Sequence, residues 1–178
     1  MSFWRGDGIR LRGIEPRDAQ TLMDWHEDSE LSRHMDFLAP PQTLESVKTF
    51  IVKETQNKLE GDHYFWMIEN DQGEGVGHID TRCNTRHGHF EYGVSIASAH
   101  QRKGYASQAI EKVLDYYFNQ LRYHKAMAGV HSDNLASQAL HESLGFQLEG
   151  RLREMVFTNG AWVDMLWYGR LAASPNPR

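Results

Sequence analysis

The order of strand-like and helix-like segments predicts an α+β protein around a mixed, mostly antiparallel, seven-stranded sheet. Strand-like stretches pair as hairpins at 63–82 and 146–171, whereas amphipathic helical stretches connect the other strands. The expected order is strand, helix, helix, three strands, helix, strand, helix, two strands. Hairpins mixed with helical crossovers are typical of α+β folds and exclude a doubly wound parallel sheet.

The first part of the chain reads as one strand followed by two helices. IRLRGI at 9–14 alternates apolar and polar residues like a strand, and the Pro-Arg-Asp cluster then opens a helix at 16–26. A second helical region runs over 43–59, where apolar residues recur near helical spacing. The intervening Asp36 to Gln42 contains a Pro-Pro pair and is expected to be a loop.

Three strands follow in the middle of the chain. HYFWMIE at 63–69 reads as a largely buried strand, and VGHIDTR at 76–82 is its hairpin partner. The glycines at 73–77 join two strands, so they do not form a dinucleotide fingerprint, which must lead into a helix. HFEYGVSIA at 89–97 alternates cleanly, which places one set of apolar side chains on one face.

The second half alternates helices with strands and closes on a hairpin. Apolar residues from 106 to 121 form one helical stripe after Gly104. KAMAGVH at 125–131 is a short strand, and a helix is expected over 134–144. The closing hairpin comprises 146–157 and 161–171.

Composition predicts one folded domain over 1–171, with a frayed tail at 172–178. The chain has 178 residues, of which 40% are hydrophobic, which argues against disorder. Its 19 basic and 24 acidic residues give a net charge of -5. This balance disfavours nucleic acid or an anionic membrane as partner and tolerates a cationic one.

Cysteine and hydropathy patterns favour a cytoplasmic protein. The single Cys83 excludes an internal disulfide and suits a reducing compartment. No apolar run approaches the roughly 20 residues that span a bilayer, and the start, MSFWRGDG, lacks the apolar region of a secretory signal. The 10 histidines form no tight metal-ligand pattern, so no metal is expected.

The stretch Gln101-Arg102-Lys103-Gly104-Tyr105-Ala106 is a candidate phosphate seat. A helix N-terminus offers unpaired N–H groups and the positive end of the helix dipole to an anion. Gly104 permits a tight turn without a Cβ, and the Ser107 hydroxyl is a further donor. Polar loops that end in glycine before a helix are common, so an ordinary loop is the alternative.

Two motifs resemble the GCN5-related N-acetyltransferases. Gln101-x-x-Gly104-x-Ala106, after the strand Val94-Ser95-Ile96, resembles their acetyl-CoA signature. Asn134-x-x-Ser137 is similar to the branch that acetylates ribosomal-protein N-termini. Further matches to that branch are Gly145-Phe146, Glu149-Gly150, Gly160-x-x-x-Asp164 and Tyr168. The resemblance extends over residues 8 to 171.

The resemblance implies a V-shaped splay between the strands at 89–97 and 125–131, with acetyl-CoA as cosubstrate lying in the V. Its pantetheine would pair with one strand, and its pyrophosphate would rest on the amides that open the following helix. The implied cosubstrate-binding residues are Val94, Ser95, Ile96, Gln101, Arg102, Lys103, Gly104, Tyr105, Ala106, Ser107 and Asn134. Asn134 is alternatively a helix cap.

Amine acetylation needs a group that receives the amine proton and a group that stabilises the departing thiolate. Glu91 lies five residues before Ile96, about 16 Å along a strand, and is a candidate base near the far end of pantetheine. A surface carboxylate is its alternative reading, and water is the alternative base. Members of the ribosomal branch carry Ser at the position of Ser137, which implies a hydrogen bond to sulfur, and an ordinary helix serine is the alternative. Many relatives carry a Tyr acid at position 141, where this chain has His141, which could donate a proton near neutral pH.

The acceptor is expected to be a primary amine, with a peptide N-terminus favoured. An α-amine has a pKa near 7.7–8.0 and a lysine side chain near 10.4, so a weak base suffices for the α-amine. A polyamine, amino sugar or antibiotic is the alternative, as is a non-catalytic acyl-CoA sensor. The acceptor pocket is expected at 20–60, where Trp25, His34, Met35 and Phe37 are candidates, although core residues are their alternative reading. The chain is expected to be a monomer or homodimer.

Overall fold

The computed structural model describes residues 2–6, 8–35, 38–57 and 61–173. Phe37, the predicted helix end at Leu59 and most of the predicted tail lie outside the described residues. The described part of the expected loop, 38–42, has no helix or strand, in agreement with its proline pair.

The α+β class and the mostly antiparallel sheet are confirmed. The strands are β1 (Ile9–Gly13), β2 (Phe65–Asn70), β3 (Gly75–Asn84), β4 (His89–Ile96), β5 (Lys125–His131), β6 (Gln147–Thr158) and β7 (Ala161–Leu171). The helices are α1 (Ala19–His26), α2 (Ser29–Met35), α3 (Leu44–Asn57), α4 (Tyr105–Asp115) and α5 (Leu135–Ser143). The strands form a seven-stranded sheet in the order β1-β2-β3-β4-β5-β7-β6, and an isolated bridge joins Arg5 to Arg10.

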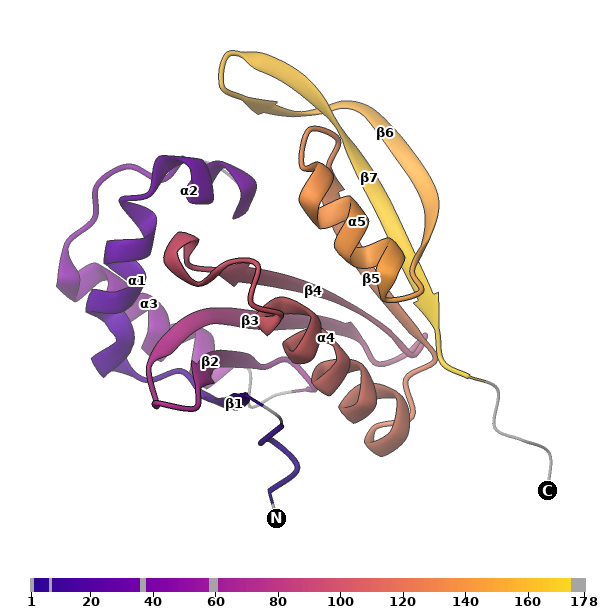
Figure 1. The fold of residues 1–178 in the computed structure, drawn as a ribbon, viewed down its shortest axis with the longest axis horizontal. Helices are drawn as coiled ribbons and strands as arrows, with labels where there is room; N and C mark the ends of the chain where they lie inside the picture. The colour runs from indigo at the N-terminus through magenta and orange to yellow at the C-terminus, as the bar shows by residue number, and fades with distance from the viewer. Residues whose placement is uncertain (1, 7, 36–37, 58–60, 174–178) are drawn as a thin grey trace.

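Helices cover the two faces of the sheet in separate groups, α4 and α5 on one side and α1 and α3 on the other (Figure 1). Successive side chains of β2 point to opposite faces of the sheet and so pack into two different cores. Trp66 and Ile68 belong to the larger core cluster, which includes α4, whereas Met67 packs with Leu22 and Ile51 of the α1–α3 layer. The alternation of side chains along β2 therefore contributes apolar residues to the cores on both faces of the sheet.

The prediction of two helices before β2 was wrong, because α2 lies between them. Its seven residues are too few for a helical period to be visible in the sequence. The structure starts this helix with a side-chain cap, since the Leu31 amide donates to Asp28 Oδ1 over 3.1 Å. Leu31 and Ser32 are buried, so tertiary packing stabilises the short segment.

The sheet separates into two halves between β4 and β5. These parallel strands pair only at three positions, from His89 with Lys125 to Glu91 with Met127. Beyond this point β4 continues beside β3 as far as Ile96, and β5 continues beside β7 as far as His131. The predicted V-shaped splay is therefore present. Among the described residues, no helix combines the length and hydropathy that a membrane crossing requires.

Candidate active site

A cavity of about 620 Å³ lies in the splay. It is lined by Tyr92–Ile96 of β4 and Ala128–His131 of β5, by the loop and helix start around Gly104, by α5, and by the side of α2. Every predicted catalytic and cosubstrate-binding residue lines this cavity except Glu91 and Lys103. Residues far apart in sequence thus meet at the opening between the two halves of the sheet.

The loop before α4 presents its backbone toward the cavity. Arg102 and Gly104 both have left-handed conformations, with φ of 60° and 81°. Gly104 is the N-cap of α4 and provides no side-chain cap, so the first-turn amides remain available to an anion. Gln101 fixes the loop to the end of β4, because its Nε2 donates to the Ile96 carbonyl over 3.1 Å. This geometry fits a phosphate seat.

On the opposite wall, Asn134 is the N-cap of α5. Its Oδ1 accepts a hydrogen bond from the Ser137 amide over 3.0 Å, so the capping role considered for Asn134 is real. The amide nitrogen of the same side chain is still a donor for a ligand, because capping uses only the oxygen. Ser137 Oγ lies 3.4 Å from His141 Nδ1.

His141 is packed inside the wall of the cavity. Its ring lies between Tyr92 and Tyr168, with centroid distances of 5.8 and 5.9 Å, and the residue is only 3% exposed. Burial lowers the pKa of His141, although a hydrogen bond to the Ser137 carbonyl, 2.7 Å from Nδ1, acts in the opposite direction. A neutral imidazole that donates from Nδ1 has an acceptor lone pair at Nε2, so this environment favours Ser137 over His141 as proton donor.

Glu91 lies at the closed end of the splay. It occupies the last paired position of β4, beside Met127 of β5, and its β3 partner is Arg82. The cavity begins at the next residue, Tyr92. Glu91 is therefore adjacent to the cavity but outside its lining, which suits a proton path through water better than direct contact.

The structure adds wall residues that the sequence did not reveal. Glu30 and Leu31 of α2 face the cavity together with the predicted His34 and Met35. Gly129 and Met165, from β5 and β7, also line the cavity. The predicted Trp25 instead packs beside the α1–α3 core, where its ring stacks on His78 at 6.2 Å. These additional residues reach the cavity because of the position of α2 and the register of the strands, and the sequence pattern shows neither.

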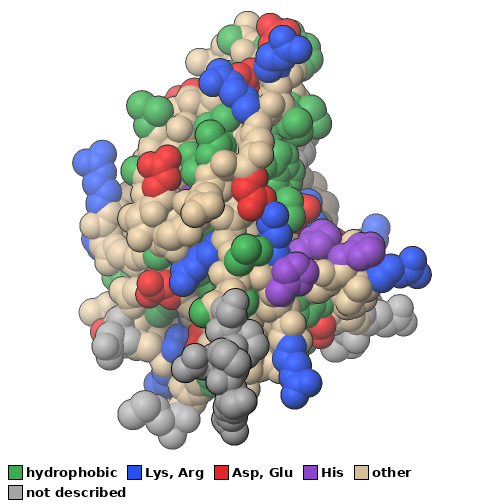
Figure 2. All heavy atoms as spheres, turned by 90° about the vertical axis from the view of Figure 1, so that its right-hand side faces the viewer, with side chains coloured by type: hydrophobic (Ala, Val, Ile, Leu, Met, Phe, Trp, Pro, Cys, Tyr) green, Lys and Arg blue, Asp and Glu red, His purple; other side chains and the backbone are tan. Residues whose placement is uncertain are grey.

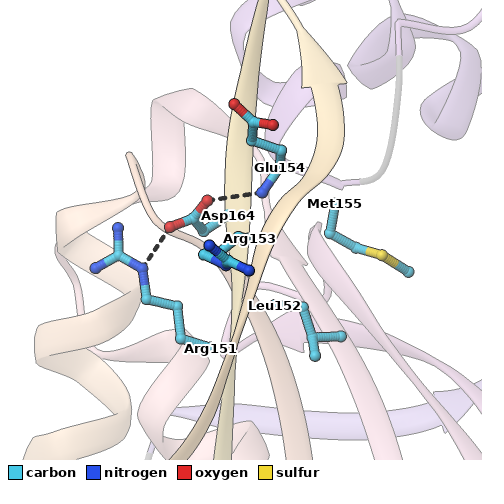
Figure 3. Close-up of a pocket in the computed structure, with 6 residues that line it drawn as sticks. All are labelled: Arg151, Leu152, Arg153, Glu154, Met155 and Asp164. Atoms are coloured by element: carbon cyan, nitrogen blue, oxygen red, sulfur yellow. Dashed lines mark hydrogen bonds and ion pairs between the residues drawn. The ribbon is translucent and has the colours of Figure 1, made fainter.

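A second hollow, on the β6–β7 hairpin, holds the Asp164 match but gathers no catalytic set (Figure 3). The Asp164 carboxylate accepts from the Glu154 amide over 2.8 Å and from Arg151 Nε. Glu154 has a positive φ of 50° in a register shift of β6, so these bonds hold a bulge. Asp164 also joins Ser132 through two hydrogen bonds, of 2.9 and 3.1 Å, which ties the hairpin to the segment before Asn134.

Histidine side chains gather on the face shown in Figure 2. The ring of His87, in the turn before β4, stacks on that of His89, the first residue of β4, with centroids 6.5 Å apart. Within the described part of the chain, no group of three or more His, Cys, Asp or Glu side chains has the arrangement of a metal site.

Comparison with known proteins identifies the class. A family model described as an acetyltransferase (GNAT) domain matches residues 9–147. The N-acetyltransferase YokL of Bacillus subtilis (strain 168) is 33% identical over 170 residues, covering 95% of this chain and 93% of YokL. The spermidine N(1)-acetyltransferase of Vibrio cholerae serotype O1 is 27% identical over 158 residues, covering 88% and 89%. The chain belongs to the GNAT acetyltransferase family.

A solved structure of spermidine N-acetyltransferase from Vibrio cholerae, in complex with CoA and spermine, has the same fold. Its TM-score is 0.82 at 24% identity, with 94% of this chain and 97% of that chain covered. Family membership makes the chain an acyltransferase that uses acetyl-CoA as its cosubstrate. The uncapped helix terminus and the splayed strands fit such a cosubstrate.

Proposed function

We propose that this enzyme transfers the acetyl group of acetyl-CoA to the N-terminal α-amine of a peptide or protein. The main support for the proposal is the splay between β4 and β5. The N-terminus of α4, which has no side-chain cap, lies on one side of the cavity, and α2 lies on the other. One ligand can thus extend from the Gly104 loop into the sheet while a second enters beside α2.

The proposed cosubstrate contacts follow from backbone groups that have no partner strand and from donors at two helix starts. From Val94 to Ile96 the edge of β4 that faces β5 has no strand partner, so it can pair with the amides of pantetheine. The amides from Arg102 to Ser107 receive the pyrophosphate, and Lys103 adds charge from outside the cavity lining. The Asn134 amide nitrogen donates to pantetheine from the other wall.

The proposed chemistry is a direct attack of the amine on the thioester. The thioester supplies the activated acetyl carbon, and the protein orients the amine and removes its proton. Ser137 donates a hydrogen bond to the departing sulfur, with His141 as the second candidate. Glu91 receives the amine proton through water, because it lies just outside the cavity.

An α-amine suits this modest catalytic equipment. At pH 7 it is deprotonated a few hundred times more often than a lysine side chain, so a distant carboxylate and water can complete the deprotonation. A polyamine is the second candidate, and the similarity to a spermidine acetyltransferase favours it.

We also propose that the reaction takes place in the cytoplasm and that the enzyme acts as a monomer or homodimer.

Acetylation rates on a matched acceptor panel test the choice of acceptor. The panel contains a lysine-free peptide with a free N-terminus, the same peptide N-formylated and carrying one internal lysine, spermidine, and glucosamine. We expect the free N-terminal peptide to give the highest kcat/KM, by about 10-fold or more, because its amine has the lowest charged fraction among the peptides. A highest kcat/KM for spermidine would support the second candidate instead, and no acetylation of any acceptor would contradict the proposed function.

A further inference from the structure

A side-chain hydrogen bond joins the start of α2 to the turn that follows β4. Ser98 Oγ donates to Asp28 Oδ2 over 2.5 Å, between residues that are 70 positions apart in the chain. Asp28 lies directly before α2, and the short 3₁₀ turn Ser98–His100 leads to the Gly104 loop. This hydrogen bond therefore connects the wall proposed for the acceptor with the loop proposed for the pyrophosphate.

The Asp28 carboxylate uses its two oxygens for two different contacts. Oδ1 accepts the hydrogen bond from the Leu31 amide that caps α2, and Oδ2 accepts the one from Ser98. Hydrogen bonds from the Ser98 hydroxyl and from the Leu31 amide lower the pKa of Asp28, so this carboxylate is ionised at neutral pH. A cap needs only one oxygen, so the bond to Ser98 gives the start of α2 a second fixed point.

The turn that contains Ser98 is itself fixed to the sheet, because the Ala97 amide donates to the Val76 carbonyl over 2.9 Å. Helix α2 has seven residues, and a helix this short depends on tertiary contacts. Ser32 Oγ ties it to α1 by donating to the His26 carbonyl over 2.9 Å. Four residues of α2 line the cavity, so the position of this helix decides the shape of the acceptor wall.

We propose that Asp28 and Ser98 are positioning residues, whose hydrogen bond holds α2 beside the cosubstrate loop and so keeps the acceptor wall in place. Asp28 lies outside the cavity lining, so it acts through α2 and not on the reacting atoms. The proposal rests on the proposed amine acetylation and adds the pair of residues that fixes the acceptor side of the same site.

The test compares two variants that break this hydrogen bond from opposite sides. Ser98→Ala removes the hydroxyl, whereas Asp28→Ser keeps an oxygen that can cap α2 but removes the carboxylate. Each should raise KM for the acceptor of highest kcat/KM about 5-fold or more, because α2 is then less well fixed. The double variant should have the KM of the single variants, since all three lack the same bond.

Two physical measurements separate positioning from a direct contact with the cosubstrate. The Kd of acetyl-CoA, measured by calorimetry, should stay at the wild-type value in Ser98→Ala and in Asp28→Ser. Backbone amides of α2 should exchange with deuterium faster in both variants, whereas the amides of α3 should keep their wild-type rates.

Asp24→Ser and Ser98→Thr are the matched controls. Asp24 also accepts an exposed side-chain hydrogen bond, from Gln20 Nε2 over 2.8 Å, and lies outside the cavity lining. Asp24→Ser removes the same charge as Asp28→Ser and should leave KM unchanged. Ser98→Thr retains the hydroxyl and should keep both KM and the exchange rates of α2 near the wild-type values.

A wild-type KM in both Ser98→Ala and Asp28→Ser would overturn the inference while leaving the proposed function intact. A raised Kd of acetyl-CoA in Ser98→Ala, with a wild-type KM in Asp28→Ser, would also overturn it, because Ser98 would then act by contacting the cosubstrate. Failure of the wild-type enzyme to acetylate any amine would overturn the proposed function itself.

Discussion

Replacing Gly104 by glutamate is expected to weaken acetyl-CoA binding by at least about 100-fold, or about 2.7 kcal/mol. The glutamate side chain would enter the proposed pyrophosphate seat, and its charge would repel the phosphates. It would also be strained, because Gly104 has a φ of 81°. Isothermal titration of the folded variant with acetyl-CoA measures the change.

The control for backbone strain is Gly73→Glu in the turn between β2 and β3. Gly73 has a similar φ of 76° and open space around it, so glutamate there meets the same conformational penalty away from the cavity. This variant should bind acetyl-CoA as the wild-type enzyme does. Equal affinity in folded Gly104→Glu and wild-type protein would contradict the phosphate seat.

Ser137→Ala is expected to lower kcat about 100-fold while leaving the Kd of acetyl-CoA unchanged. A hydroxyl that contacts the sulfur acts mainly when charge develops there, and loss of one such donor costs on the order of 10²–10³ in kcat. Steady-state kinetics on the favoured acceptor, together with calorimetry, separates these two effects. Ser137 keeps its backbone bond to Asn134 in the variant, so the cap of α5 is preserved.

Two further variants serve as the control for Ser137→Ala and as the test of His141 as the alternative acid. Ser143→Ala removes a hydroxyl from the same helix that is not part of the cavity lining. The Ser143 hydroxyl donates a hydrogen bond of 2.7 Å to the Leu140 carbonyl, and this variant should keep full kcat. His141→Phe keeps a ring between Tyr92 and Tyr168 without a proton to donate. A large loss of kcat in His141→Phe, with normal kcat in Ser137→Ala, would transfer the acid role to His141.

Regular alternation made much of the sheet predictable from the sequence. The strand predicted at 125–131 matches β5, and the closing strand predicted at 161–171 matches β7. β5 has 7 residues and β7 has 11, and the Asn159-Gly160 turn marks the start of β7 in the sequence. Helix α2 was not predicted, because its stability comes from a cap by Asp28 and from burial of Leu31.

The parts of the candidate site at helix starts could be predicted from the sequence, whereas the parts that depend on strand pairing could not. Gly104 and Asn134 are the N-caps of α4 and α5, and a local sequence pattern indicates such positions. The position of Glu91 at the closed end of the splay depends on where β5 separates from β4. Pairing between strands is non-local, so a single sequence does not specify this position.

A crystal structure of the enzyme with bound CoA would show whether the splay holds the cosubstrate. We expect pantetheine along Val94–Ile96 inside the splay, pyrophosphate oxygens within hydrogen-bond distance of the amides from Arg102 to Ser107, and sulfur near the Ser137 hydroxyl. CoA bound outside the splay, or its pyrophosphate away from the Gly104 loop, would contradict the proposed binding mode.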